Sequence, residues 1–321
     1  MRNALSSTII AVAIACLAAP ATAQDYPSRP LRVIVPLPAG GAVDTVVRSM
    51  AHRLMGSIGE NVIVDNRPGA GGSIGMETAM AASPDGYTVV AIGATQLIYP
   101  LIYKARYDLL RDFEPVSQMT AQGYVVIVHP SLPVHSVSDL VQHLKANPGK
   151  LNFASSGIGG TIHLTGELFM DATGTQMTHV PYKGGGPALT DVIRGEVQMH
   201  FSVVISAIPH IQSGRLKPLA IGGEQRFVTL PRVPTFAEAG LAGFDLRPWQ
   251  GMFAPAGTPR PIVDRLSGEV GKIVSMPEVR DKLVSLGMEP LVSTPEQFAV
   301  LLQADMAKAA KVIKVANIRL N

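Results

Sequence analysis

The sequence predicts an α/β protein with two lobes, each a mostly parallel sheet flanked by helices. Three observations lead to this prediction. Short apolar runs rich in β-branched residues alternate with segments of helical periodicity along most of the chain. Loops rich in glycine follow several of these runs. One set of strands and helices is also inserted in the sequence between two parts of the other set. The chain is therefore expected to cross between the lobes twice.

The N-terminus has the pattern of a secretory signal. Arg2 supplies the charged region, residues 9–19 are apolar but too short to span a bilayer, and residues 21–23 form a small-x-small cleavage site. We therefore expect residues 1–23 to be a signal peptide and the mature chain to be periplasmic. The alternative is a lipoprotein that is cleaved before Cys16, although residues 13–15 match that signal poorly.

Composition excludes several functional classes. The hydrophobic content of 47% with 16% charged residues is typical of a folded globular protein. Lys and Arg are scattered and the net charge is only +3, which argues against nucleic-acid binding. Cys16 is the only cysteine, so a mature chain cleaved near residue 24 has no disulfide and no thiolate metal site. No later segment has the ~20 apolar residues of a membrane helix.

The first strand, loop and helix form a potential anion site. Residues 31–35 predict a buried strand, and Pro36 ends it. A helix follows from about residue 42, since Val43, Val46, Val47, Met50 and Leu54 recur at helical spacing. A glycine loop at a helix start directs backbone N–H groups at one place. Asp44 in the first turn would repel an anion, so we interpret it as a residue that orients the loop.

The remaining elements of the first lobe repeat this arrangement. Strands are expected at 61–65 and 87–92, with a helix at about 74–82 between them. Loops at 36–42, 66–73 and 93–96 follow the three strands. In sheets of this kind ligands bind at the carboxyl ends of the strands, so the three loops are expected to lie along one edge.

A second set of elements begins near residue 124. Its predicted strands are 124–130, 151–154, 176–181, 197–202 and 216–221, and its predicted helices include 138–146 and 187–194. Loops at 155–161 and 182–187 again follow strands. The strand 249–255 then returns to the first lobe, and helices at 258–275, 277–286 and 294–316 complete it. We thus expect one domain from 24–123 plus 250–321, a second from 124–249, and a hinged clamp between them.

Motifs for catalysis and cofactors are weak. The glycine runs do not fit a dinucleotide fingerprint because Ile74 and Ile162 stand at the third glycine position, and neither a P-loop nor a GxSxG elbow is present. His163 and Glu167 stand at helical i,i+4 spacing and could ligate a metal, but a packing pair is the more common use. A serine hydrolase using Ser155 or Ser156 with His163 is the rival function. We predict no cofactor, no metal and no enzymatic activity.

The loops do provide small neutral hydrogen-bonding groups. These are the 38–42 backbone, Thr95, Ser155, Ser156, Thr161 and the 184–186 backbone. Such groups suit a carboxylate that is held by amides and hydroxyls. Lys183 could add a charge or could simply face solvent.

Several motifs, in order along the mature chain, resemble one family. They are Tyr-Pro-Ser-Arg-Pro at 26–30, Pro-Leu-Pro-Ala-Gly-Gly at 36–41, Asn-Arg-Pro-Gly-Ala-Gly-Gly at 66–72, Ser-Ser-Gly-Ile-Gly at 155–159, His-Val-Pro-Tyr-Lys-Gly at 179–184 and Gly-Met-Phe-Ala-Pro-Ala-Gly-Thr-Pro at 251–259. The sequence resembles the Bug or TctC-like receptors, the solute-binding proteins of tripartite tricarboxylate transporters.

The resemblance implies a periplasmic binding protein of the Venus-flytrap type that captures a small carboxylate between its domains. It would act as a monomer and deliver the ligand to membrane transporter subunits or, as an orphan receptor, to a sensor kinase. The ligand-binding residues predicted from the resemblance and the loops together are Leu37, Ala39, Gly40, Gly41, Thr95, Ser155, Ser156, Gly159, Thr161, His163, Gly184 and Ser202.

Two of these positions depart from the family pattern. Leu37 stands where the family usually has an aromatic residue, and Ser202 stands where it often has an aspartate. The missing negative charge at Ser202 predicts that a ligand amino group is disfavoured and that an uncharged or anionic ligand end is admitted.

Overall fold

The computed structural model describes residues 26–242, 244, 247–315 and 318. The expected signal peptide at 1–23, with Cys16, lies outside these residues. No helix in the described part of the chain is both long and apolar enough to cross a membrane.

The first lobe contains a six-stranded sheet with the order β11-β4-β10-β3-β1-β2. Strands β1 to β4 run in one direction, whereas β10 and β11 run in the opposite direction. Their bounds are β1 Leu31–Val35, β2 Val62–Asn66, β3 Thr88–Gly93, β4 Phe113–Gln122, β10 Trp249–Pro255 and β11 Met288–Pro290.

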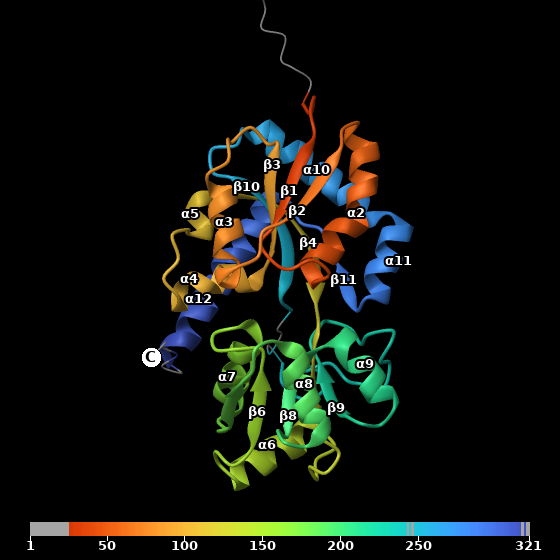
Figure 1. The fold of residues 1–321 in the computed structure, drawn as a ribbon. Coiled ribbons are helices and arrows are strands. Elements are labelled where there is room, and N and C mark those ends of the chain that lie inside the picture. Colours follow the sequence, from red (N-terminus) through yellow and green to blue (C-terminus); the bar gives the residue numbers. More distant parts are fainter. Residues whose placement is uncertain (1–25, 243, 245–246, 316–317, 319–321) are drawn as a thin grey trace, which may run out of the picture.

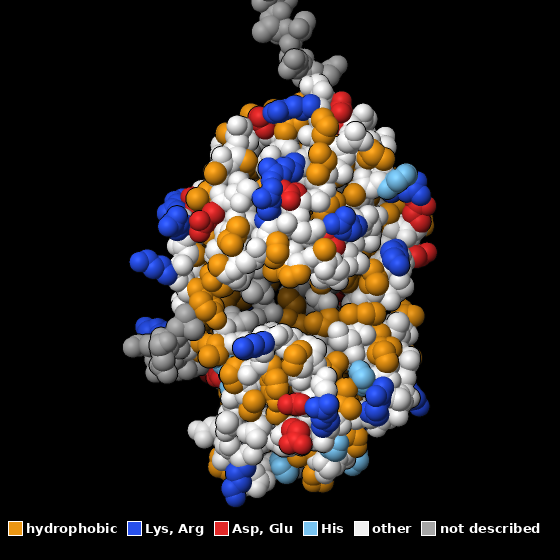
Figure 2. All heavy atoms as spheres, in the orientation of Figure 1, with side chains coloured by type: hydrophobic (Ala, Val, Ile, Leu, Met, Phe, Trp, Pro, Cys, Tyr) orange, Lys and Arg blue, Asp and Glu red, His pale blue; other side chains and the backbone are white. Residues whose placement is uncertain are grey.

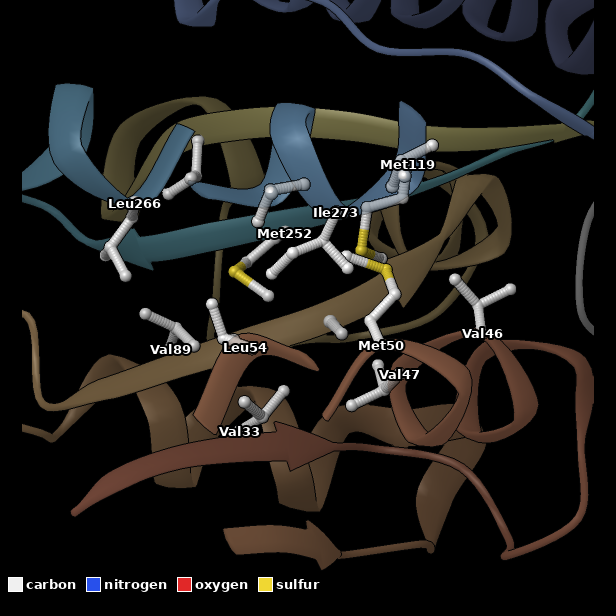
Figure 3. Packing of buried hydrophobic residues seen from close by; sticks show 14 of the residues in the cluster. Val33, Val46, Val47, Met50, Leu54, Val89, Met119, Met252, Leu266 and Ile273 are labelled. Carbon is white, nitrogen blue, oxygen red and sulfur yellow. The ribbon is translucent and has the colours of Figure 1, made fainter. Parts of the chain in front are cut away.

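Helices cover both faces of this sheet (Figure 1). One face packs against α2, α10 and α11, and the other against α3, α4 and α12. Figure 3 shows Met50 and Leu54 of α2 in one apolar layer with Val33, Val89 and Ile273. The helices are α2 Ala42–Ile58, the short 3-10 turn η1 Ala70–Gly72, α3 Ser73–Met80, α4 Ala94–Ile102, α5 Leu109–Asp112, α10 Arg260–Ser275, α11 Pro277–Ser285 and α12 Pro295–Val315.

The second lobe contains a five-stranded sheet with the order β7-β6-β8-β5-β9. Only β5 runs against the other strands of this sheet. Its apolar residues pack against α6 and α7 on one face and against α8 and α9 on the other. The bounds are β5 Tyr124–Val128, α6 Val137–Ala146, β6 Asn152–Ser155, α7 Thr161–Thr173, β7 Thr178–Pro181, α8 Gly185–Arg194, β8 Met199–Val203, α9 Val204–Gln212 and β9 Lys217–Ile221.

Two crossover segments join the lobes, which Figure 1 shows one above the other. The chain leaves the first sheet at the end of β4 and enters the second with β5, and it returns between β9 and β10. The N–H of Gln122 donates to the carbonyl oxygen of Pro248 at 2.9 Å, so the two segments are hydrogen-bonded to each other. Gly123 is needed at the crossing because an added Cβ would lie 2.7 Å from the Phe227 ring. We keep 24–123 with 250–321, and 124–249, as the proposed domain limits.

Helix α12 belongs to the first lobe but also contacts the second. One apolar cluster joins Ile98 of α4, Leu164 of α7, and Ala309 and Val312 of α12. The lobes are therefore connected by side-chain packing along one side as well as by the crossover segments.

The predicted two-sheet α/β fold is confirmed, with local differences. Strand 249–255 is found as predicted, whereas residues 94–96, expected in a loop, form the first turn of α4. Strands β4 and β11 were not predicted. Strand β4 contains Pro115 and several polar residues without alternation, and it is a strand because it pairs with β10 on one side and β11 on the other. The reversed strands, β10 and β11 in the first sheet and β5 in the second, make both sheets mixed.

The close packing of α3 on the end of β1 gives a testable prediction. A Cβ at Gly75 would lie 2.6 Å from Pro36 Cβ, at the start of the first loop. We expect Gly75→Ala to lower the free energy of unfolding by about 1–3 kcal/mol, since overpacking outweighs the gain in helix propensity. Gly56→Ala is the control, because no atom lies within 4 Å of a Cβ there. Urea unfolding measures both, and an equal or greater stability of Gly75→Ala would contradict the close contact.

Candidate ligand-binding site

Four helices that follow strands, two in each lobe, begin at glycines. The N-caps of α2, α4, α7 and α8 are Gly41, Gly93, Gly160 and Gly184, and none of these helices has a capping bond from its N-cap side chain. In contrast, Ser136 caps α6 through its side chain. The first N–H groups of a helix have no partner within the helix. Two helix starts from each lobe therefore offer backbone donors, and a partial positive charge, at the ends of strands.

The buried carboxylate of Asp44 organises the first loop. Asp44 Oδ2 accepts a hydrogen bond from the Gly40 N–H at 2.8 Å, and Oδ1 accepts one from Asn66 Nδ2 at 2.9 Å. Asn66 also donates to the Leu37 carbonyl oxygen at 3.1 Å, while Arg48 Nε lies 3.0 Å from both Asp44 oxygens. These contacts hold both ends of the 37–40 turn.

Asp44 is 2% exposed and remains ionised. Burial opposes its ionisation, but hydrogen bonds from Arg48, Gly40 and Asn66 outweigh burial and hold its pKa below the ordinary value. The interpretation that Asp44 orients the loop agrees with this geometry. One expectation needs correction: the Gly40 N–H is bonded to Asp44, and the Gly41 N–H points at the Pro38 carbonyl oxygen 3.3 Å away. The donors left in this part of the site are those of Ala39 and the first turn of α2.

Gln96 joins the second and third loops of the first lobe and was missed at the sequence level. Its Oε1 accepts from the Gly93 N–H at 3.2 Å, and its Nε2 donates to the Gly71 carbonyl oxygen at 3.2 Å. The Tyr107 hydroxyl donates to the Gln96 carbonyl oxygen at 2.8 Å. The only sequence signal was a glutamine three residues after a glycine N-cap. The predicted ligand residue Thr95 lies beside it, half-buried, in the first turn of α4.

In the second lobe, Ser155 shapes the loop that follows β6. Its hydroxyl accepts from the Gly157 N–H at 3.1 Å and lies 2.6 Å from His179 Nε2. The Gly159 N–H donates to His163 Nδ1 at 3.0 Å. Ser155 is fully buried, so this predicted ligand residue supports the loop from below. Ser156 is half-buried and Ile158 is exposed, whereas the predicted ligand residue Gly159 is buried and its N–H is bonded to His163.

A stack of two imidazoles lies beneath this loop. The rings of His163 and His179 are 3.7 Å apart and nearly parallel. Burial, and then the neighbouring His163, lower the pKa of His179 to about 3, so His179 is neutral at physiological pH. The other nitrogen of His163, Nε2, lies 3.3 Å from Glu167 Oε1. Both ring nitrogens of His163 are thus engaged, which makes it a support for the loop.

The catalytic and metal alternatives find little geometric support. Among the described contacts, His163 makes no hydrogen bond to Ser155 or Ser156. Ser155 does contact His179, but the serine side chain is fully buried and has no access to solvent. Within the described residues, no three His, Cys, Asp or Glu side chains gather in a way that could hold a metal ion.

The other predicted residues lie at the margins of the second-lobe loops. The Gly184 N–H donates to the Ser156 carbonyl oxygen at 3.2 Å, which joins the loops after β6 and β7. Thr161 Oγ1 lies 2.6 Å from the hydroxyl of Tyr124, the first residue of β5. Ser202 is 1% exposed, and its hydroxyl donates to the Val203 carbonyl oxygen at 3.2 Å. It places no charge in the site.

The second-lobe loop touches the first lobe directly. The Tyr103 hydroxyl donates to the Ile158 carbonyl oxygen at 2.9 Å, and an added Cβ on Gly159 would lie 2.3 Å from Ile102 Cδ1. Figure 2 shows the surface hollowed between the lobes, with hydrophobic side chains around the hollow. The lobes are therefore in contact beside a cleft.

Comparison with known proteins agrees with this architecture. The family model described as "Tripartite tricarboxylate transporter family receptor" matches residues 46–318. The chain belongs to this receptor family. The receptor is 34% identical to protein BugT of Bordetella pertussis over 323 residues, which cover 100% of this chain and 99% of BugT.

Solved structures share the fold. The periplasmic binding protein BugD is 33% identical, has a TM-score of 0.74, and is matched over 92% of this chain and 99% of BugD. The R. palustris protein Rpa4515, solved with adipate, is 34% identical with a TM-score of 0.78, over 92% of this chain and 99% of that chain. The fold of the receptor is therefore that of a two-lobed periplasmic binding protein.

The contacts of Asp44 predict that its carboxylate contributes more to the stability of the fold than the exposed carboxylate of Asp264 does. We expect Asp44→Asn to lower the free energy of unfolding by about 2 kcal/mol, because an amide cannot accept from Gly40, Asn66 and Arg48 together and leaves buried donors unpaired. Asp264→Asn is the matched control, since that carboxylate is half exposed in its ion pair with Arg260 and should change stability by less than about 1 kcal/mol. Urea denaturation of the two variants measures the difference. Equal effects would argue against a structural role for Asp44.

Buried neutral histidines predict a loss of stability in acid. Burial lowers the pKa of His200 to about 4, and burial with His163 lowers that of His179 to about 3, against 6.5 for an ordinary histidine. The unfolded chain therefore binds protons first as the pH falls below 6.5, and the folded state loses stability until the pH reaches these lowered values. We expect His200 alone to account for a loss of about 2 kcal/mol at pH 5.

Urea unfolding at pH 7 and pH 5 tests this pH dependence. His179→Gln should make the loss smaller, and His135→Gln, at an exposed histidine, should leave it unchanged. A free energy of unfolding that does not fall between the two pH values would contradict the burial of neutral imidazoles.

Proposed function

We propose that this receptor is a periplasmic solute-binding protein that captures a small carboxylate between its lobes. The observation that carries the proposal is the set of glycine N-caps at α2, α4, α7 and α8, which leave first-turn N–H groups of both lobes without side-chain caps. Backbone amides and helix starts bind anions without a cationic side chain. Asp44 is bonded to Arg48 and His179 is neutral, so neither places an unpaired charge at the loops, whereas the side chain of Lys183 is exposed in the loop after β7.

The proposed contacts follow from the groups that are not fully buried. In the first lobe these are Ala39, the first turn of α2 and Thr95, and in the second lobe Ser156, the backbone of Ile158, Thr161 and the first turn of α7. The N–H groups of Gly157 and Gly159 are already bonded to Ser155 and His163. Leu37 would form an apolar wall, because its half-buried side chain packs against the core of the first lobe. The adipate in the relative from R. palustris supports a carboxylate as the ligand class.

The proposed partners are the membrane subunits of a tripartite tricarboxylate-type transporter, and the proposed location is the periplasm. Family membership supports both. We propose that the receptor acts as a monomer, since one chain supplies both lobes of the site.

Mass spectrometry of the purified protein under native conditions tests the function first, because a captured ligand adds its mass. Thermal-shift measurements with mono- and dicarboxylates follow. A ligand at 100 times its Kd should stabilise the protein by about 2.7 kcal/mol. Ester turnover that Ser156→Ala abolishes would overturn the proposal, as would the absence of stabilisation by every carboxylate in the screen.

A matched pair of glycine variants tests whether contact between the lobes is needed for ligand binding. Gly159 and Gly174 both have positive φ, of 72° and 62°, and precede and follow α7. Only Gly159 contacts the other lobe, through Ile102. Alanine should cost about 1–2 kcal/mol of stability at each position. We expect Gly159→Ala to weaken ligand binding at least tenfold, because the added methyl group prevents this contact, and Gly174→Ala to leave Kd unchanged. Calorimetric titration compares them, and equal Kd values would show that closure at Ile102 is not needed.

A further inference from the structure

A cavity of about 370 Å³ lies between the lobes beside the crossover segments. Its walls come from α4, α7 and α12, and its inner end comes from β4 and the residues before β10. This volume falls within the range of small-molecule sites. No contact described above for the carboxylate uses most of this cavity.

The cavity begins where the proposed carboxylate site ends. Thr161, the first residue of α7, lines it, and so does Ala94, which directly precedes Thr95 at the start of α4. A ligand whose carboxylate is bound by the first-turn amides of α4 and α7 can therefore place its other end in the cavity.

The three helices give the cavity apolar walls. The side chains that matter are Leu97 and Ile98 of α4, Leu164 and Leu168 of α7, and Leu301 of α12. Both lobes contribute, so a ligand tail buried here stabilises the closed arrangement of the lobes. Burial of apolar ligand surface against such walls is favourable in proportion to the area removed from water.

The charged groups of the cavity do not favour a second carboxylate. Arg247 is already paired, with Glu224 at 3.1 Å and Glu289 at 3.3 Å. Asp305 accepts a hydrogen bond from the indole N–H of the buried Trp249 at 3.0 Å, so it too is engaged by the protein, and as a carboxylate it offers no hydrogen-bond donor to an anion. Lys308 lies on the exposed side of α12, where solvent screens its charge. A second carboxylate would have to compete with two glutamates for Arg247.

We propose that this cavity holds the apolar tail of the ligand, which makes the receptor selective for monocarboxylates with an apolar body over dicarboxylates. This inference rests on the function proposed above, and it adds the chemical class of the ligand.

Calorimetric titration with butanoate, hexanoate, octanoate and adipate tests the proposal on the unmodified protein. Each methylene that enters the cavity should tighten binding about fourfold, and the heat-capacity change of binding should become more negative with chain length. Hexanoate should bind more tightly than adipate, which has the same number of carbons. Binding that is independent of chain length, or tighter for adipate, would overturn the cavity proposal and leave the carboxylate receptor intact. If none of the four acids binds, both the carboxylate-receptor proposal and the cavity proposal are overturned.

A variant that fills the cavity tests whether the apolar tail of the ligand lies there. Leu301→Trp should weaken octanoate and hexanoate at least tenfold and leave butanoate within about twofold, because the indole occupies the space of the longer tails. Val300→Trp is the control, since Val300 is the preceding residue of α12, is 67% exposed and does not line the cavity. Equal chain-length profiles in the two variants would overturn the placement of the tail. The series on the unmodified protein decides the proposal if Leu301→Trp does not fold.

Discussion

The antiparallel pairing of β4 with β10 is the constraint on which the arrangement of the site depends. These strands pair from Trp249 opposite Ala121 to Pro255 opposite Phe113, within the sheet of the first lobe, and both continue into the crossover segments. Because both crossings leave from neighbouring strands, the two covalent connections between the lobes lie side by side at one end of the first sheet. The packing of α7 against α4 and α12 then sets one side of the cleft.

The site is built mainly from backbone, and the side chains around it act by holding that backbone. Asp44 and Asn66 fix the first loop, Gln96 joins the next two, and Ser155 with His163 shapes the loop of the second lobe. Each of these side chains is engaged by protein partners, which leaves amides and small hydroxyls for the ligand. The proposed site would hold one carboxylate and would depend on the shape of the remaining cavity for selectivity.

Sequence reasoning succeeded where a local pattern carries the structural signal and failed where pairing decides. Apolar runs such as Leu31–Val35 and Trp249–Pro255 are strands in the structure. Strand β4 has no such pattern and exists because β10 and β11 flank it. The role of Ser155 was misjudged for a similar reason, since its hydroxyl is taken by His179, which lies 24 residues further along the chain. Gln96 was missed because an uncharged side chain inside a helix gives almost no signal without its partners.

The sequence by itself determined the family, the alternation of strands and helices, and the glycines that end strands and begin helices. These features depend on residues that are close in the chain. They follow from the spacing of apolar residues, from the φ angles that only glycine adopts easily, and from the absence of capping side chains. Only the tertiary structure decided which N–H groups stay free, which histidines are neutral, and that α4, α7 and α12 enclose an apolar cavity. Those properties arise between residues far apart in the chain, where hydrogen-bond partners, desolvation and packing are set by the fold.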